Sequence, residues 1–122
     1  MDDKQNRIRA KLDAVRISYL NHLPEKHKAI KENWSSLQRH WNHTSYNALY
    51  LIIHGLAGSA ETFGLAHLTK QARQIIDLLK PYYNQQIQPE TVEQLTALNH
   101  EINALIVLLE ESIDTMEEIS SE

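Results

Sequence analysis

Residues 23–41 read LPEKHKAIKENWSSLQRHW, and their apolar side chains recur at alternating spacings of four and three. Such spacing places one side chain per turn on a single face of a helix, the face through which helices pack side by side in bundles. Pro24 suits the first turn of a helix, because it has no N–H to donate and its φ is already helical. The stretch therefore predicts a helix that packs through Leu23, His27, Ile30, Trp34, Leu37 and Trp41.

The chain that precedes this stretch shows the same helical spacing. Residues from about 4 to 21 carry one apolar face, formed by Ile8, Leu12, Val15 and Tyr19. Pro24 then ends this segment or bends the path of the chain. We expect an additional N-terminal helix that is laid against the helices that follow.

A third helix is expected after the polar break at residues 42–45. Thr44 or Ser45 supplies the N-cap, because a hydroxyl oxygen there can accept a free N–H of the first turn. The helix runs to about Phe63, where Gly64 ends it. Its buried face is predicted to consist of Leu49, Ile52, Ile53, Leu56, Ala60 and Phe63.

Two further helices complete the pattern, and no stretch of the chain shows the sustained alternation of a strand. The fourth helix presents Leu65, Leu68, Ala72, Ile75, Ile76 and Leu79. After a break around Pro81 and Asn84, Pro89-Glu90 forms a good start for the fifth and longest helix. This helix presents Val92, Leu95, Leu98, Ile102, Leu105, Ile106, Leu109, Ile113 and Met116.

Long amphipathic helices with short connections pack most simply as an antiparallel four-helix bundle. We therefore predict an all-α chain in which residues of about 24–118 form the bundle and residues of about 4–21 form the additional helix. The 122 residues contain no internal repeat and no Gly/Ser linker, so one domain spans residues 1–122.

Composition excludes several classes of function. The chain has no cysteine, which removes thiolate metal sites and sulfur redox chemistry. Its net charge is −4 and its basic residues are scattered, so nucleic acid is not an expected partner. No segment approaches the roughly 20 apolar residues of a membrane span, so we expect no membrane insertion and a cytoplasmic location.

All three glycines lie within ten residues of His54, at Gly55, Gly58 and Gly64. Gly64 is explained as the helix end, whereas Gly55 and Gly58 fall inside the predicted helix. Each interior glycine costs about 1 kcal/mol of stability relative to alanine. A chain that uses glycine nowhere else therefore has a functional reason to place it beside this histidine.

A helical wheel indicates that reason. At 100° per residue, His54 lies roughly 140° from the centre of the buried face, so its side chain points outward. Gly58 is one turn away on the same face and removes the side chain that would shield the imidazole. The surrounding positions are predicted to dock a partner protein, in part because the rim is partly apolar; they are Asn47, Tyr50, Leu51, Ala57 and Glu61.

Residues 54–64, HGLAGSAETFG, resemble the signature of histidine phosphotransfer (HPt) domains of bacterial phosphorelays. The matching elements are the acceptor histidine at His54, the small residue at Gly58, the step Gly58-Ser59-Ala60 and the closing Phe63-Gly64. The resemblance extends to the whole chain, because that family is a helical bundle with its histidine in mid-helix on an exposed face. It implies that His54 is the phosphoacceptor and that Gly55, Ala57, Gly58 and Ser59 give access to it or position it.

The resemblance also implies the partners. His54 accepts the phosphoryl group from an aspartyl phosphate on a response-regulator receiver domain and passes it to another receiver aspartate, in a pathway with a hybrid sensor kinase. The receiver brings Mg²⁺, so the chain itself needs no cofactor. We expect a phosphocarrier without an ATP site, because the sequence contains no Walker loop and no glycine-rich nucleotide signature.

One position departs from the family pattern. Many members carry lysine or arginine three residues after the histidine, where this chain has Ala57. A cation that steadies the phosphoryl group would then come from another helix. The candidates are Lys11, Arg39, Lys70 and Arg73.

The sequence leaves two other interpretations open. The histidines at 22, 27, 40, 43, 67 and 100 raise a metal site, but no glutamate precedes a histidine by three residues as a di-iron bundle requires, so none is expected. The second is a non-catalytic interaction module that binds and sequesters a signalling partner through the same face. Ser59 also has a purely structural explanation, a hydrogen bond back to its own helix.

Overall fold

The computed structural model describes residues 2–83 and 87–121, with the side chains of residues 3–83 and 87–118. The described residues are helical with short connections and contain no strand, which confirms the predicted all-helical class. The α-helices are α1 (Asp2–Asn21), α2 (Leu23–Arg39), α3 (His43–Ser59), α4 (Ala66–Leu79) and α5 (Val92–Ser121), with 3₁₀ turns η1 (Ala60–Phe63) and η2 (Lys80–Tyr82).

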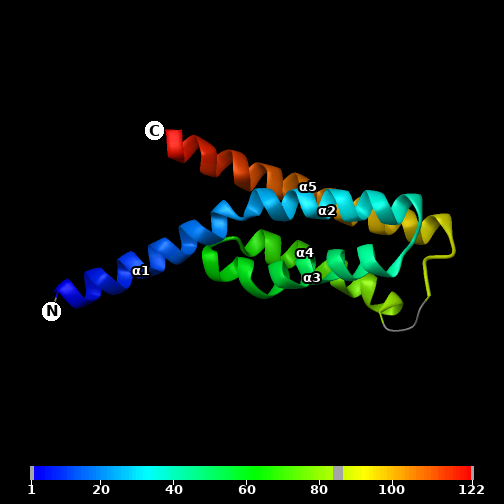
Figure 1. The fold of residues 1–122 in the computed structure, drawn as a ribbon, viewed down its shortest axis with the longest axis horizontal. Helices are drawn as coiled ribbons and strands as arrows, with labels where there is room; N and C mark the ends of the chain where they lie inside the picture. The colour runs from blue at the N-terminus through cyan, green and yellow to red at the C-terminus, as the bar shows by residue number, and fades with distance from the viewer. Residues whose placement is uncertain (1, 84–86, 122) are drawn as a thin grey trace.

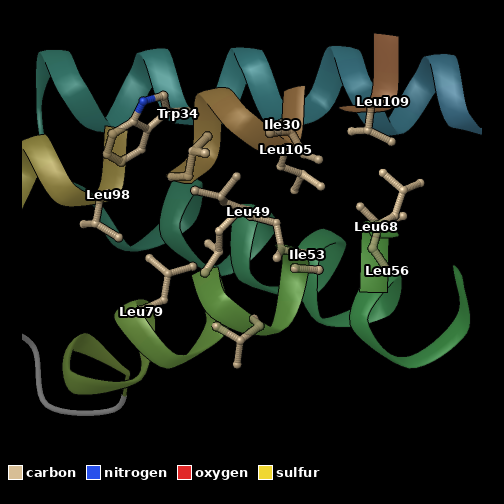
Figure 2. Close-up of a cluster of buried hydrophobic side chains, with 14 of the residues drawn as sticks. Ile30, Trp34, Leu49, Ile53, Leu56, Leu68, Leu79, Leu98, Leu105 and Leu109 are labelled. Carbon is tan, nitrogen blue, oxygen red and sulfur yellow. The ribbon is translucent and has the colours of Figure 1, made fainter. Parts of the chain in front are cut away.

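Helices α2 to α5 enclose one hydrophobic core. They run back and forth along a common direction, with α2 against α3 and α5, and α4 against α3 and α5 (Figure 1). Leucine and isoleucine dominate the core, and side chains from all four helices meet in it (Figure 2). The fully buried large side chains are Leu23, Ile30, Leu49, Ile53, Leu56, Leu68, Ile75, Leu79, Leu98, Ile102, Leu105 and Leu109.

The apolar face predicted for α2 is buried at Leu23, Ile30, Trp34 and Leu37. Trp34 can be buried because its indole N–H donates to Asn99 Oδ1 on α5 at 3.0 Å, which satisfies the one polar group of the ring. Pro24 stands in the first turn of α2, as expected.

Helix α3 begins differently from the prediction. Its N-cap is Asn42, whose side-chain oxygen accepts the backbone N–H of Ser45 at 2.9 Å, so Thr44 and Ser45 are not the cap. Ser45 is buried instead, and its hydroxyl donates to Ser36 Oγ at 2.7 Å. The α-helical part ends at Ser59, η1 continues to Phe63, and Gly64 then adopts a left-handed φ of 83°. Gly64 thus ends the element, as predicted.

Helices α4 and α5 follow the predicted apolar faces closely. The start of α5 lies two residues beyond Pro89-Glu90: Thr91 Oγ1 accepts the N–H of Gln94, and Gln94 Oε1 accepts the N–H groups of Glu90 and Thr91. This reciprocal capping explains why the helix begins at Val92. Val92 and Leu95, both predicted for this face, are 80% and 38% exposed and so lie outside the core. Asn84, part of the predicted break, lies outside the described residues.

Helix α1 corrects one expectation. It leaves the bundle at the end where α3 and η1 meet and projects away from it (Figure 1). Only its last turn packs, through Tyr19 and Leu20, whereas Ile8, Leu12 and Val15 are at least half exposed. The helix is therefore not laid against the bundle. A periodic apolar face predicts that something covers it, but no residue in the described part of the chain covers this one.

Candidate functional site

His54 lies in the middle of α3 with its imidazole exposed to solvent, as the helical wheel predicted. The opposite face of the helix is buried in the core through Leu49, Ile53 and Leu56 (Figure 2). A helix that is anchored along its whole buried face holds the outward side chain in a fixed place. The histidine is thus presented on a rigid element rather than on a loop.

The glycines beside His54 have no packing role. A Cβ atom built on Gly55 or on Gly58 would meet nothing within 4 Å, so neither glycine is needed for a close approach of another helix. Both follow His54 in the helix, so they lower the surface on the C-terminal side of the imidazole. These glycines cost helix stability and are not required by packing, so the open space beside His54 is the feature that they provide.

His54 stands at the end of a column of aromatic rings. The ring of Tyr50 is stacked on that of His54, with centroids 5.9 Å apart and planes 18° apart. Tyr50 also stacks on Tyr83 at 4.8 Å and on Tyr46 at 6.0 Å. The column restricts where the imidazole ring can turn.

The sequence predicted that Tyr50 lies next to His54 but did not predict the contact with Tyr83, which follows η2 in the chain. The spacing of Tyr46, Tyr50 and His54 by four residues is the signal that could have indicated the column, because residues four apart stack on one helix face.

Tyr46 anchors the column in the core. It is 3% exposed, and its hydroxyl donates to the carbonyl oxygen of Leu79 at 2.7 Å, which joins α3 to the end of α4. Burial, with a smaller contribution from the neighbouring phenols of Tyr50, Tyr83 and Tyr82, raises the pKa of Tyr46 to about 12. Tyr46 is therefore a neutral hydrogen-bond donor at physiological pH.

Ser59 serves the structure rather than the open face. Its hydroxyl donates to the Gly55 carbonyl oxygen at 2.6 Å, which is the bond back to its own helix that the sequence suggested. It also lies 3.0 Å from the hydroxyl of Tyr19, which stacks on Phe63 at 4.3 Å. Lys26 lies over the other side of the Tyr19 ring, and burial lowers the pKa of its ammonium group. This cluster ties the base of α1 to the end of α3.

The residues predicted to dock a partner share the His54 side of the helix. At 100° per residue, Asn47, Tyr50, Leu51 and Ala57 all lie within about 60° of it on α3, and Glu61 follows in η1. Leu51 is 69% exposed, the most open apolar side chain of this helix. Ala57 packs on the edge of the core, and Asn47 Nδ2 lies 3.0 Å from His43 Nε2. The face combines an apolar rim with polar groups.

The boundary between α3 and α4 runs beside His54. Thr69 on α4 accepts the N–H of Glu61 and lies 3.4 Å from the carbonyl oxygen of Leu56, while Tyr46 reaches Leu79 near the other end of α4. His54 is therefore level with the middle of α4. It also lies on the same flank of α3 as Tyr46, the flank that faces α4.

Of the four candidate cations, Arg73 has the best position on this boundary. By the same wheel it lies on the Thr69 side of α4, about 120° from the centre of the buried face, while Lys70 points nearly straight out at about 180°. Lys11 belongs to the projecting part of α1, and Arg39 to the last turn of α2.

Three further histidines have ordinary hydrogen-bond partners. His27 Nε2 lies 2.9 Å from Glu110 Oε1, His67 Nε2 lies 3.2 Å from Ser112 Oγ, and His22 Nδ1 lies 2.6 Å from the Ser18 carbonyl oxygen. Among the described residues, no group of three or more His, Cys, Asp or Glu side chains is placed to hold a metal ion. In the same part of the chain, no helix has the length and apolar character to cross a membrane.

Comparison with known proteins supplies the family. The family model described as "Hpt domain" matches residues 14–117, which is most of the chain. Neither the curated proteins nor the solved structures gave a match. Domains of this family carry phosphoryl groups in two-component signalling, where they work with response-regulator receivers and kinases. An exposed mid-helix histidine, a surface cleared by glycines and a match over residues 14–117 agree, and the chain belongs to the Hpt domain family.

Proposed function

We propose that this protein is a phosphorelay intermediate and that His54 is its phosphoacceptor. The observation that carries the proposal is the exposed imidazole of His54 on a core-anchored helix whose neighbouring glycines leave open space. In the first step a ring nitrogen attacks the phosphorus of a receiver aspartyl phosphate; an N–P bond forms and the acyl O–P bond breaks. In the second step the carboxylate of another receiver aspartate takes the phosphoryl group, and the imidazole is released.

For this chemistry the carrier needs only to position the imidazole and to provide favourable electrostatics. A neutral imidazole is nucleophilic at physiological pH, and phosphoryl transfer depends mainly on alignment and electrostatic stabilisation. The proposal therefore includes no ATP site and no resident cofactor, because the receiver supplies Mg²⁺. The protein would act as a phosphocarrier and not as a kinase.

Two groups support His54 in this proposal. Tyr50, held between Tyr46 and Tyr83, positions the imidazole through the stacked rings. Arg73 supplies the cation that the family commonly carries at the position of Ala57, since its guanidinium can bind phosphoryl oxygens across the α3–α4 boundary.

The receiver would dock on the outward face of α3 and η1, which presents Asn47, Tyr50, Leu51, Gly58 and Glu61 around the histidine. Leu51 and the edge of Ala57 provide apolar contact, and the polar groups form the rim, as in many protein interfaces. We propose receivers and a hybrid sensor kinase as partners, with no nucleic acid, in the cytoplasm. The proposed domain organisation is a single domain over residues 1–122, in which α2 to α5 form an antiparallel four-helix bundle and α1 is an additional N-terminal helix.

The test is labelling with a phosphorylated receiver in the presence of Mg²⁺. We expect an acid-labile, alkali-stable phosphoryl group on the wild-type chain and none on His54→Gln, with unchanged helical circular dichroism. His100→Gln, another exposed histidine, is the matched control and should label normally. Labelling that survives in His54→Gln would refute the assignment. Tight receiver binding without any labelling of the wild type would favour a sequestering module instead.

A further inference from the structure

Aromatic side chains are concentrated at one end of the bundle and lead from there to His54. The chain has two tryptophans, five tyrosines and one phenylalanine, and five of these eight rings form one connected group. The group begins where the turn between α2 and α3 meets η2, at the end of the bundle opposite α1 (Figure 1). Its members are Trp41, Tyr46, Tyr50, Tyr82 and Tyr83, and its last contact is with His54.

Tyr83 makes the closest of the three ring contacts of Tyr50. Its ring centroid lies 4.8 Å from that of Tyr50 with the planes 17° apart, compared with 6.0 Å for Tyr46 and 5.9 Å for His54. Tyr46 is buried, whereas Tyr83 is 43% exposed. Tyr50 therefore has one neighbouring ring toward the core and one toward solvent, and together they restrict how its own ring can turn.

A stacked ring can orient an imidazole without blocking its reaction. The nitrogens of His54 lie in the plane of its ring, so a ring stacked on its face restrains rotation and leaves both nitrogens free. Helical spacing alone does not provide this restraint, because Tyr50 can adopt other rotamers unless a neighbour excludes them. Tyr83 is a neighbour from outside α3, since it follows η2 in the chain.

We propose, on the basis of the phosphoacceptor function proposed for His54, that Tyr83 is a positioning residue for phosphotransfer. It holds Tyr50 against the imidazole and so keeps His54 in the orientation from which a ring nitrogen attacks. Small losses of alignment between reacting groups lower the rate of a reaction strongly. The orientation of the reactive ring thus depends on the connection between α4 and α5 as well as on α3.

Nuclear magnetic resonance spectra of the full chain, recorded at a fixed pH without any receiver, report the stack on His54. A ring stacked on the imidazole shifts its protons upfield through the ring current, and Tyr50→Ala gives the value without a stack. We expect Tyr83→Ala to move these protons toward the Tyr50→Ala value. Tyr83→Phe should leave them unchanged, because phenylalanine keeps the stacked ring. Ile87→Ala, at a 44% exposed apolar residue of the same connection, is the matched control and should have no effect.

Transfer from a phosphorylated receiver supplies the second measurement. Loss of one stacked aromatic contact corresponds to about a 2- to 10-fold change in an equilibrium or rate. We expect Tyr83→Ala to lower the transfer rate at saturating receiver by this factor and to leave the half-saturating receiver concentration unchanged, because docking is not affected. If Tyr83 acts through Tyr50, the double variant Tyr50→Ala/Tyr83→Ala should transfer no more slowly than Tyr50→Ala alone.

Two results would overturn the role of Tyr83 while leaving the phosphoacceptor function intact. Unchanged imidazole shifts in Tyr83→Ala would show that Tyr83 does not hold the stack. A higher half-saturating receiver concentration at an unchanged saturated rate would show that Tyr83 is a docking contact and not a positioning residue. A wild type that never accepts a phosphoryl group would refute the phosphorelay function, and the role of Tyr83 in transfer with it.

Discussion

At the scale of single residues, the helical period determined most of what could be predicted about the site. It placed His54 outward and Gly58 beside it, and it suggested the bond from Ser59 back to its own helix. The stacking of Tyr83 on Tyr50 could not be predicted in this way, since Tyr83 comes from a different part of the chain. Contacts within one helix follow from spacing, whereas contacts between segments require the fold.

Gly58 is the residue at which stability and function should diverge. Because a Cβ there meets nothing within 4 Å, Gly58→Ala should raise the free energy of unfolding, by up to about 1 kcal/mol, with little effect on transfer. Gly58→Leu and Gly58→Glu should also fold, but they would obstruct the receiver or repel the incoming phosphate, so transfer should fall steeply.

Thermal melts and the rate of phosphotransfer from a phosphorylated receiver, measured on the same three preparations, check this prediction. Normal transfer in the folded leucine and glutamate variants would show that the receiver does not approach past Gly58. Unfolding of those variants would show that the space is occupied.

At the scale of helices, apolar faces were predicted well and helix starts less well. The buried faces of α2 and α4 agree with the spacing, because burial of a face needs only the period. The cap of α3 was wrong because several cap-forming residues stand in a row, and the choice of Asn42 depends on Ser45 bonding to Ser36 across the turn. When several adjacent residues can all form an N-cap, a tertiary contact determines which one does, and local residue preference cannot identify it.

The relation of α4 to α3 leads to a prediction for Arg73. Loss of a charge-assisted hydrogen bond to a phosphoryl oxygen costs about 1.5–3 kcal/mol, which corresponds to a transfer rate lower by about 10- to 100-fold. Arg73→Ala should show this loss without a change in thermal stability, since Arg73 is exposed. Lys70→Ala, on the same helix but pointing away, is the control and should transfer normally. Single-turnover transfer kinetics measure both variants. If only Lys70→Ala transferred slowly, Lys70 and not Arg73 would be the cation that binds the phosphoryl group.

At the scale of the whole molecule, the sequence predicted an all-helical single chain but not what covers α1. The expectation that the bundle covers this helix was wrong, because four apolar positions at helical spacing among many charged residues make α1 only weakly amphipathic, and Ile8, Leu12 and Val15 are at least half exposed.

The stability of the whole fold should depend on alkaline pH through Tyr46, which joins α3 to α4. Its pKa is raised from 10.0 to about 12 in the folded chain by burial first and by neighbouring phenols second. Between these values the unfolded chain releases the phenol proton while the folded chain keeps it, so the unfolded state binds fewer protons. The contribution of Tyr46 to stability is therefore complete below pH 10 and is lost as the pH rises towards 12.

Denaturant unfolding between pH 8 and pH 12 measures this dependence. The wild type should lose stability above pH 10, and Tyr46→Phe should lose less over the same interval because no proton is released there. At pH 7 the variant should be less stable by about 1 kcal/mol, since the Leu79 carbonyl loses its hydrogen bond. Tyr83→Phe, which removes one of the neighbouring phenols that raise the pKa of Tyr46, should reduce the slope only slightly, because burial is the larger cause. Equal slopes for the wild type and Tyr46→Phe would mean that another group, and not the buried phenol that ties α3 to α4, governs alkaline unfolding.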